Sequence, residues 1–268
     1  MTTRVLINGV ETSGTVPVTD SSVLRGDGCF EVLKTYGGRP FALDEHLDRL
    51  SRSAKALEIP LPGRHELGQW ITDVARSCGD CAVRVVVTRG SAVPGDTAEP
   101  LVIVFAHPWS RAVGPATLFP VPAPWHAAGV DWDLAGTKVL SYAPNMAATR
   151  HAVARGFGDA LLTTVEGVML EGPTFSVAWV VEGVLETPTL ELGILDSITR
   201  RVMFELASDL GLDVVEGAWA LDRLDDADEV MALSTVREIQ PVAEVGERRY
   251  REGPITADLA RLFYQRVG

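Results

Sequence analysis

The sequence predicts a two-domain α/β (α+β) protein, with a smaller N-terminal α/β domain and a larger C-terminal one. At 268 residues and 46% hydrophobic content, the chain can bury a full core. Strand-like and helix-like segments follow one another along it, and a proline-rich stretch separates two such series. We expect an N-terminal domain at residues 1–107, an interdomain linker at 108–125 and a C-terminal domain at 126–268.

The N-terminal part is expected to form strands and two helices. Residues 4–11 and 29–41 are rich in β-forming residues and carry Asn-Gly and Gly-Gly turn signals. Residues 43–59 repeat leucine or alanine at helical spacing, which predicts an amphipathic helix packed on a sheet. After a second helix, residues 82–90 and 101–107 are apolar, β-branched strands.

The C-terminal part predicts two helices and several strands. Residues 143–156 carry proline in the first turn and end at a glycine, as an α-helix does. Two hairpins are expected at 159–172 and 177–188, each turning at a Glu-Gly pair. A helix at 196–211, capped by Asp196 or Ser197, precedes a strand at 228–235.

Charge and composition limit the kinds of molecule that this protein is expected to bind. A formal net charge of −12 argues against nucleic acid as a partner, because proteins that bind phosphate backbones concentrate positive charge. We therefore expect small-molecule chemistry. The sequence contains no apolar run of the length found in signal peptides or membrane-spanning helices, so we expect a cytoplasmic protein with no membrane partner.

Cysteine and histidine give no sign of a metal site. Cys78 and Cys81 form a Cys-Gly-Asp-Cys motif, but no second Cys/His pair lies nearby, and we expect two thiols that flank a turn. The five histidines show no metal-ligand spacing, which argues against a metal hydrolase. His46, close to Arg49, is expected to pack or to support its neighbours.

Lys138 is the first candidate for a catalytic residue. It is one of three lysines in the chain and lies in the stretch "LAGTKVLSYAPN". Burial of a lysine disfavours its charged form and lowers its pKa, so that the amine can attack a carbonyl and form a Schiff base. The alternative is a lysine whose stem packs while its ammonium reaches solvent.

Neighbouring segments favour the first reading of Lys138. Glu171 follows apolar residues at the end of a hairpin strand, where a carboxylate could keep a pyridine nitrogen protonated. The helix start "DSITRR" offers the backbone N–H groups of Ile198 and Thr199 to a phosphate. Arg49 could add positive charge to such a site, or it could be a solvated surface residue.

Taken together, these positions resemble a known family. The chain is similar to fold-type IV pyridoxal-phosphate enzymes, the class IV aminotransferase family, which contains branched-chain and D-amino acid aminotransferases, R-selective amine transaminases and aminodeoxychorismate lyases. Six blocks in register carry the resemblance, at residues 25–50, 83–90, 136–156, 161–174, 186–201 and 227–242. It implies a C-terminal pseudo-barrel domain, pyridoxal 5′-phosphate as cofactor and a homodimer.

The resemblance also implies roles for individual residues. Lys138 matches the catalytic lysine that forms the internal aldimine and moves the proton, and Glu171 matches the partner of the pyridine nitrogen. Tyr142 falls near the tyrosine that hydrogen-bonds the cofactor's phenolic oxygen, and Leu195 matches the apolar residue under the ring. The phosphate-binding positions are Arg49, Ile198, Thr199 and Thr235. The substrate pocket is expected to contain Arg25, Phe30, Val32, Arg84, Arg89 and Val236.

The resemblance implies an aminotransferase that passes an amino group from an amino acid or amine to a 2-keto acid in ping-pong half reactions. The stretch "TRGSAVPGDT" lacks the Arg-x-His of D-amino acid aminotransferases. The residues 82–84 keep the arginine of a branched-chain Tyr-x-Arg motif but replace its tyrosine by Ala82. The alternative is an aminodeoxychorismate lyase that releases pyruvate and 4-aminobenzoate, although Val32 stands where such lyases often carry threonine. A binding protein that kept the fold without activity is a third reading.

Overall fold

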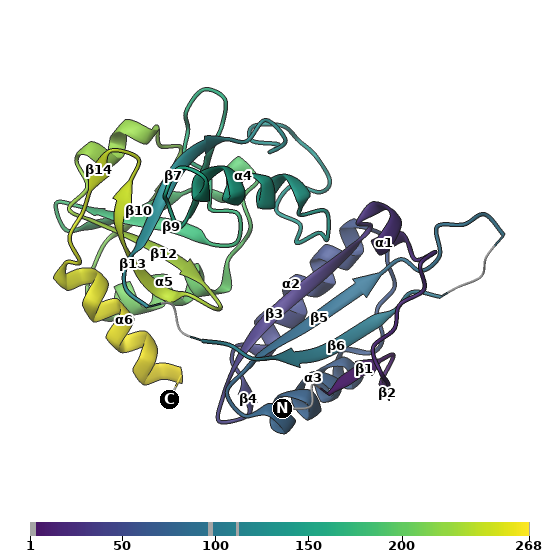
Figure 1. Cartoon of the computed structure of the whole chain (residues 1–268). Helices are drawn as coiled ribbons and strands as arrows, with labels where there is room; N and C mark the ends of the chain where they lie inside the picture. The colour runs from purple at the N-terminus through teal and green to yellow at the C-terminus, as the bar shows by residue number, and fades with distance from the viewer. Residues whose placement is uncertain (1–3, 96–98, 111–112, 268) are drawn as a thin grey trace. The chain divides into compact units, whose positions relative to one another are not determined.

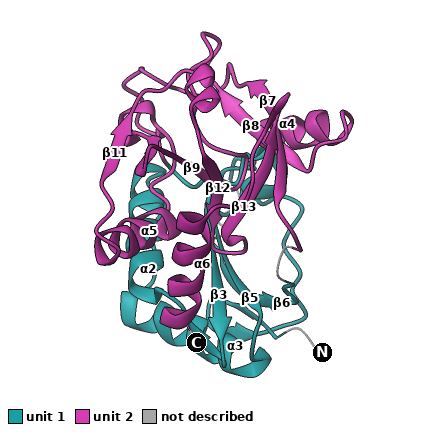
Figure 2. Ribbon diagram, turned by 90° about the vertical axis from the view of Figure 1, so that its left-hand side faces the viewer, with its two compact units in different colours: residues 1–110, 137–142 teal, residues 111–136, 143–268 magenta. Residues whose placement is uncertain are grey.

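The computed structural model describes residues 4–95, 99–110 and 113–267. Its chain forms two compact units (Figure 1; Figure 2). Unit 1 contains Met1–Ser110 and Thr137–Tyr142, and unit 2 contains Arg111–Gly136 and Ala143–Gly268. The short segment that carries Lys138 therefore packs with the N-terminal residues, which the sequence analysis did not foresee.

Unit 1 is built on one antiparallel sheet in the order β2-β1-β6-β5-β3-β4. The predicted Asn-Gly turn joins the first two strands, and both Asn8 and Gly9 adopt positive φ (48° and 78°), as tight hairpins require. The strands are β1 (Val5–Ile7), β2 (Val10–Glu11), β3 (Gly28–Tyr36), β4 (Arg39–Pro40), β5 (Ala82–Thr88) and β6 (Val102–His107).

Two helices cover one face of this sheet. The short α1 (Ser21–Arg25) precedes β3, while α2 (Leu43–Ala56) and α3 (Arg64–Cys78) contribute Leu47, Leu50, Leu67, Ile71 and Val74 to the core. On β5 the alternate residues Val83, Val85 and Val87 are fully buried against them. Because strand side chains alternate, the residues between these valines lie on the opposite face.

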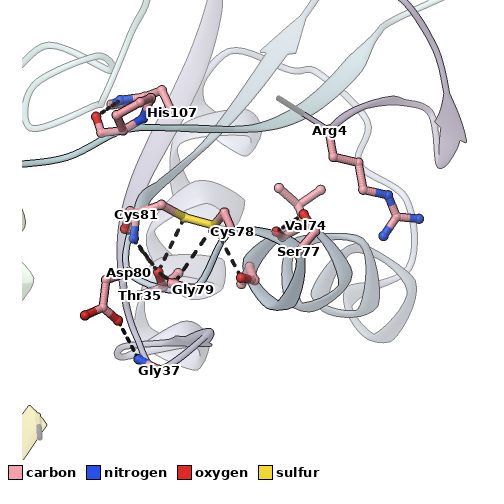
Figure 3. The surroundings of a disulfide bond; sticks show 12 residues. Arg4, Thr35, Gly37, Val74, Ser77, Cys78, Gly79, Asp80, Cys81 and His107 are labelled. Atoms are coloured by element: carbon pink, nitrogen blue, oxygen red, sulfur yellow. Dashed lines mark hydrogen bonds between the residues drawn. A yellow bond between two sulfur atoms is a disulfide. The ribbon is translucent and has the colours of Figure 1, made fainter. Parts of the chain in front are cut away.

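Cys78 and Cys81 form a disulfide at the turn between α3 and β5 (Figure 3). This corrects the expectation of two thiols. Thr35 on β3 fastens the turn, because its hydroxyl donates to the Gly79 carbonyl and accepts the Cys81 N–H at 2.9 Å. Gly37 N–H also donates to the Asp80 carboxylate at 2.7 Å. A three-residue spacing allowed this pairing, but the sequence offered no second pair to indicate it.

Unit 2 contains a mixed eight-stranded sheet in the order β11-β10-β9-β12-β13-β7-β8, with β14 paired to β13. The second predicted hairpin is confirmed: Glu182 and Gly183 form the turn between β9 and β10 with positive φ. The strands are β7 (Ala116–Pro122), β8 (Asp159–Thr163), β9 (Ser176–Val181), β10 (Val184–Pro188), β11 (Val214–Gly217), β12 (Glu229–Ser234), β13 (Glu238–Val245) and β14 (Arg248–Arg249).

Strand β7 lies inside the stretch that was expected to be a linker. It pairs in parallel with β13 on one side and with β8 on the other. Two of the five prolines of this stretch, Pro120 and Pro122, lie within β7 and hid the strand from pattern analysis, because proline is unusual inside a sheet. The first predicted hairpin is also irregular. The chain after its turn forms no regular strand beside β8 and pairs with it by an isolated antiparallel bridge between Thr163 and Met169.

Three α-helices complete unit 2, namely α4 (Ala143–Val153), α5 (Ile198–Asp209) and α6 (Pro254–Val267). The short helices η1 (Leu190–Leu192) and η2 (Leu221–Asp225) lie in connections. Ser197 rather than Asp196 caps α5, since its hydroxyl accepts the Arg200 N–H at 3.3 Å. Among the described residues, no helix is both long and apolar enough to cross a membrane.

Glu229 on β12 holds the start of α6, and its loss is expected to destabilise unit 2. Its carboxylate accepts the N–H groups of Ile255 and Thr256 at 3.1 and 2.6 Å, and the residue is only 4% exposed. Replacing Glu229 by alanine leaves these donors without their acceptor, so we expect the free energy of unfolding in urea to fall by about 2 kcal/mol. The exposed Glu247→Ala serves as control and is expected to change it by less than about 0.5 kcal/mol. Equal effects of the two substitutions would contradict this role.

Candidate active site

Lys138 is held against the start of β3 by backbone hydrogen bonds. The Phe30 N–H donates to the Lys138 carbonyl at 3.1 Å, and the Leu140 N–H donates to the Gly28 carbonyl at 2.8 Å. The Lys138 N–H in turn donates to the Ser53 hydroxyl of α2 at 3.2 Å. A segment more than one hundred residues downstream of β3 is thus fixed beside it as a short antiparallel addition.

Gly28 makes this close approach possible. A Cβ atom at this position would lie 2.3 Å from the Val87 carbonyl oxygen and 2.6 Å from a methyl carbon of Leu140. Any side chain would therefore have to displace either β5 or the lysine segment. Gly28, the second glycine of the "RGDG" block, is therefore required for the Lys138 segment to pack against β3.

The Lys138 side chain lies among aromatic rings. Its Nζ is 4.5 Å from the centre of the Phe30 ring and 5.8 Å from that of Tyr142. The two rings meet edge to face with their centres 5.2 Å apart. The Arg84 guanidinium carbon is 5.4 Å from the Phe30 ring centre. We call these four residues, Phe30, Arg84, Lys138 and Tyr142, the Phe30 cluster; each was selected from the sequence.

Strand register places the expected pocket residues of unit 1 on one face. Val32 is directly opposite Arg84 in the β3–β5 ladder, and Phe30 is opposite Val86. All four lie on the sheet face away from α2 and α3, because alternate strand residues share a face. Burial lowers the pKa of Arg84, and the interaction with Tyr142 opposes this shift. Within the described part of the chain, no carboxylate forms an ion pair with Arg84.

The other two arginines expected in the pocket lie elsewhere. The Arg89 guanidinium donates to the Asp27 carboxylate at 2.6 and 3.2 Å and to the Leu57 carbonyl at 2.6 Å. Its charge is therefore already compensated. Arg25 is the exposed last residue of α1. Among the described residues, no hydrogen bond, ion pair or cation–ring contact joins either arginine to the Phe30 cluster.

Arg49 belongs to a buried ionic cluster with Glu31 and His46, each at most 5% exposed. Its Nε and Nη2 atoms donate to the two Glu31 oxygens at 2.7 and 2.8 Å, and His46 Nδ1 contacts Oε2 at 2.7 Å. Burial alone would raise the pKa of Glu31, but the charge and hydrogen bonds of Arg49, then those of His46, hold it well below its usual range. Burial lowers the pKa of His46, and the nearby charge of Lys138 contributes in the same direction.

Unit 2 presents Glu171 with its carboxylate fixed. The Leu195 N–H donates to both carboxylate oxygens, at 3.2 and 3.3 Å. His126 Nε2 lies 3.7 Å from Oε1, and the Glu171 side chain remains 15% exposed. An oriented carboxylate with remaining acceptor capacity can bind a protonated ring nitrogen.

The expected phosphate-binding positions of unit 2 lie at the ends of two elements. Ile198 and Thr199 open α5, where backbone N–H groups have no acceptor within the helix. Thr235 and Val236 lie half-buried in the three-residue connection between β12 and β13. Helix N-termini and turns of this kind bind phosphate groups well. Glu171, Leu195 and these four residues all belong to unit 2.

Several residues that support the candidate site were not predicted from the sequence. Glu31 follows Cys29 and precedes Leu33 on the apolar face of β3, so a charge in this alternating pattern was a usable signal of a buried partner. His126 and Arg237 gave no comparable signal. Their contacts join segments far apart in the chain.

Comparisons with known proteins all point to one protein family. The family model for amino-transferase class IV matches residues 28–245. A putative branched-chain-amino-acid aminotransferase of Methanocaldococcus jannaschii is 33% identical over 97% of this chain and 95% of its own. A bifunctional aminodeoxychorismate lyase / D-amino acid transaminase of Mycobacterium tuberculosis is 29% identical over 91% of this chain and 90% of its own.

Solved structures show the same similarity. The PLP-bound form of a hypothetical aminotransferase from Mycobacterium tuberculosis has a TM-score of 0.89 at 27% identity, covering 98% of each chain. A fold IV transaminase from Curtobacterium pusillum has a TM-score of 0.85 at 30% identity, covering 95% of this chain and 92% of its own. The expected fold type is confirmed, and the chain belongs to the class IV aminotransferase family.

Proposed function

We propose that this protein is a pyridoxal 5′-phosphate-dependent aminotransferase that moves an amino group between an amino acid, or an amine, and a 2-keto acid. The observation that carries the proposal is the placement of Lys138, whose Nζ lies 4.5 Å from the centre of the Phe30 ring, with the Arg84 guanidinium carbon 5.4 Å from the same centre. A primary amine suits reaction with a carbonyl, and a neighbouring guanidinium suits recognition of an acid. Family membership and similarity to a PLP-bound aminotransferase support the same reading.

The chemistry of individual residues supports pyridoxal 5′-phosphate as the cofactor. Glu171, oriented by the Leu195 N–H, would bind the ring nitrogen, and Leu195 itself would pack under the ring. Ile198, Thr199 and Thr235 would hold the phosphate, with Arg49 adding positive charge. Tyr142 would hydrogen-bond the phenolic oxygen. When bound, the cofactor supplies an aldehyde that reacts with amines and a ring that accepts the electron pair left at the substrate Cα.

The protein residues perform the proton chemistry around this group. Lys138 Nζ would take the proton from the Cα of the amino donor and pass it to the carbon that carried the cofactor's aldehyde, after which hydrolysis by water releases the keto product. With a keto acid as acceptor, Nζ returns a proton to Cα. Glu171, kept in one orientation by the Leu195 N–H, holds a proton on the ring nitrogen through both half reactions.

Arg84 is proposed to bind the carboxylate of the amino donor. It is half-buried on the sheet face of the Phe30 cluster, and an anion would supply its missing counter-charge. Replacing Arg84 by methionine is expected to raise KM for amino acid donors about 10- to 100-fold. Primary amines without a carboxylate should keep their KM. Stopped-flow half reactions with matched acid and amine donors measure both, and an equal loss for the two would contradict this role.

Half reactions with a donor panel test the proposed function. Purified protein loaded with pyridoxal 5′-phosphate is mixed with L-amino acids, D-amino acids, R-amines or aminodeoxychorismate. We expect an amino donor to convert the absorbance to that of the pyridoxamine form, and a 2-keto acid to restore it. No conversion with any donor by a protein that binds the cofactor would favour the binding-protein reading.

A second candidate is aminodeoxychorismate lyase, favoured by the similarity to the bifunctional enzyme of Mycobacterium tuberculosis. Lysine and glutamate would serve this reaction in the same positions. Pyruvate released from aminodeoxychorismate in the absence of any keto acceptor would identify the lyase. Activity only in the presence of an acceptor would identify the aminotransferase.

Two broader properties are part of the proposal. The family resemblance supports a homodimer, for which light scattering should give twice the 28.8 kDa of one chain. The sequence supports a cytoplasmic location, and cell fractionation tests it. Neither nucleic acid nor membrane is proposed as a partner, in keeping with the net charge of −12.

A further inference from the structure

Arg237 is the last residue of the connection between β12 and β13, and both its backbone and its side chain make hydrogen bonds. Ser234 is paired with Glu238 across the ladder, so residues 235–237 form the connection itself. The Arg237 N–H donates to the Ser234 hydroxyl at 3.1 Å, and its guanidinium donates to Gln240 Oε1 at 2.9 Å. The guanidinium carbon also lies 4.6 Å from the Phe175 ring centre.

The strongest contact of Arg237 reaches β8. Its Nη2 donates to Asp159 Oδ2 at 2.6 Å, and the two side chains are 20% and 8% exposed. The other Asp159 oxygen accepts the Thr149 hydroxyl of α4 at 2.8 Å. Asp159 is therefore anchored on its own side, and Arg237 ties the connection to the first residue of β8.

Strand β8 leads directly to Glu171. The Leu162 N–H donates to the Glu171 carbonyl at 2.8 Å, and the Leu170 N–H donates to the Leu162 carbonyl at 2.9 Å. Leu162 is the third residue after Asp159 along the strand. The Arg237–Asp159 pair thus connects the 235–237 connection with the strand that supports the Glu171 backbone.

The connection also contains backbone strain that needs external support. Glu238 is not glycine, yet its φ is +58°, and it is 2% exposed. Such a conformation persists where surrounding contacts determine it. The bonds of Arg237 to Ser234, Gln240 and Asp159 supply that determination immediately before the strained residue.

We propose that Arg237, through Asp159, is a positioning residue that sets the distance between the Thr235–Val236 turn and Glu171. This inference rests on the proposed function, in which these two places hold the phosphate and the ring nitrogen of one cofactor. Arg237 itself does not touch the cofactor, because its guanidinium bonds Asp159 and Gln240. It acts by keeping the phosphate-binding turn in register with Glu171.

Binding to the apo-protein tests this role without reliance on turnover. Dissociation constants for pyridoxal 5′-phosphate and for pyridoxal, which lacks the phosphate, are measured by fluorescence titration. Arg237→Met is expected to weaken binding of the phosphorylated ligand at least 10-fold and that of pyridoxal less than 2-fold. Asp159→Asn should have the same selective effect, and the double variant should be no worse than the stronger single one.

Arg223 offers a matched control in the same unit. It too donates to a buried carboxylate, that of Glu186, and lies over an aromatic ring, Trp219. Arg223→Met should leave the ratio of the two dissociation constants unchanged, whatever it does to thermal stability. If Arg237→Met does not fold, Arg237→Lys, which keeps the charge but loses the second donor, should show a smaller selective loss.

Several outcomes would overturn the proposal. Equal losses for both ligands, or none, would show that Arg237 stabilises the fold alone. A selective loss in Arg237→Met without one in Asp159→Asn would point to direct contact between Arg237 and phosphate. If the wild-type protein binds neither ligand, the proposed function itself fails, which is a different result from any of these.

Discussion

Replacing Lys138 by alanine is expected to abolish turnover and the visible absorbance of the bound cofactor. In the proposed function this side chain supplies both the amine that binds the cofactor covalently and the base that moves the Cα proton, so one substitution would remove two functions. We expect kcat to fall by at least about 10³-fold. Absorbance spectra, steady-state rates and borohydride reduction followed by peptide mapping measure these effects, and the reduced wild-type protein should carry the label on Lys138.

Lys55 provides the control for Lys138. It is an exposed residue of α2, and its replacement by alanine should change neither spectrum nor rate. The backbone bonds that hold the 138–140 segment do not depend on the lysine side chain, so the Lys138→Ala fold should persist. A Lys138→Ala protein that is still yellow after dialysis and still turns over would refute the assignment.

Replacing Glu31 by glutamine is expected to produce the largest loss of stability in unit 1. The carboxylate is 1% exposed and accepts two hydrogen bonds from Arg49, so its removal leaves a buried guanidinium without counter-charge. Breaking one partner of a buried pair costs about 3–5 kcal/mol. Urea unfolding at neutral pH measures this loss. Asp44→Asn, at an exposed partner of Arg64, should change the free energy of unfolding by less than about 1 kcal/mol.

The same cluster predicts how stability depends on pH. The pKa of Glu31 is lower in the folded protein than in the unfolded chain, so its contribution is present above about pH 4.3 and is lost as pH falls towards the folded value. The pKa of His46 is also lowered, so the unfolded chain binds its proton first and stability begins to fall below about pH 6.5. Glu31→Gln should flatten the acid limb of the stability curve. An unchanged acid limb would contradict the ionised state of Glu31.

Glu31 also bears on the site, because it fixes Arg49. The guanidinium uses Nε and Nη2 for Glu31, which holds its plane in one orientation. A phosphate role for Arg49 would therefore depend on Glu31 as well. Glu31→Gln is expected to weaken cofactor binding together with stability, whereas Asp44→Asn should affect neither.

Most of the local elements, and the family, could be predicted from the amino-acid sequence alone. Helical spacing located α2, a glutamate and a glycine located the β9–β10 turn, and the adjacent Asp196 and Ser197, either of which could cap a helix, located the start of α5. These features depend on residues within a few positions of each other, so a single sequence contains the information. Six blocks indicated the family because they follow one another along this chain in the same order as in the family. The family model matches residues 28–245, and the blocks lie at residues 25–242.

Contacts between residues far apart in the chain became visible in the folded structure and could not be predicted from the sequence. Strand β7 exists within a proline-rich stretch because β8 and β13 supply its hydrogen-bond partners. Lys138 packs with unit 1 because Gly28 leaves room for its segment beside β3, and Arg49 is buried because Glu31 lies opposite it. Arg237 and Asp159 are 78 residues apart in the chain, yet they form one ion pair. A local sequence pattern does not indicate such pairings. Strand register, close packing and charge compensation between distant segments arise only when the chain folds.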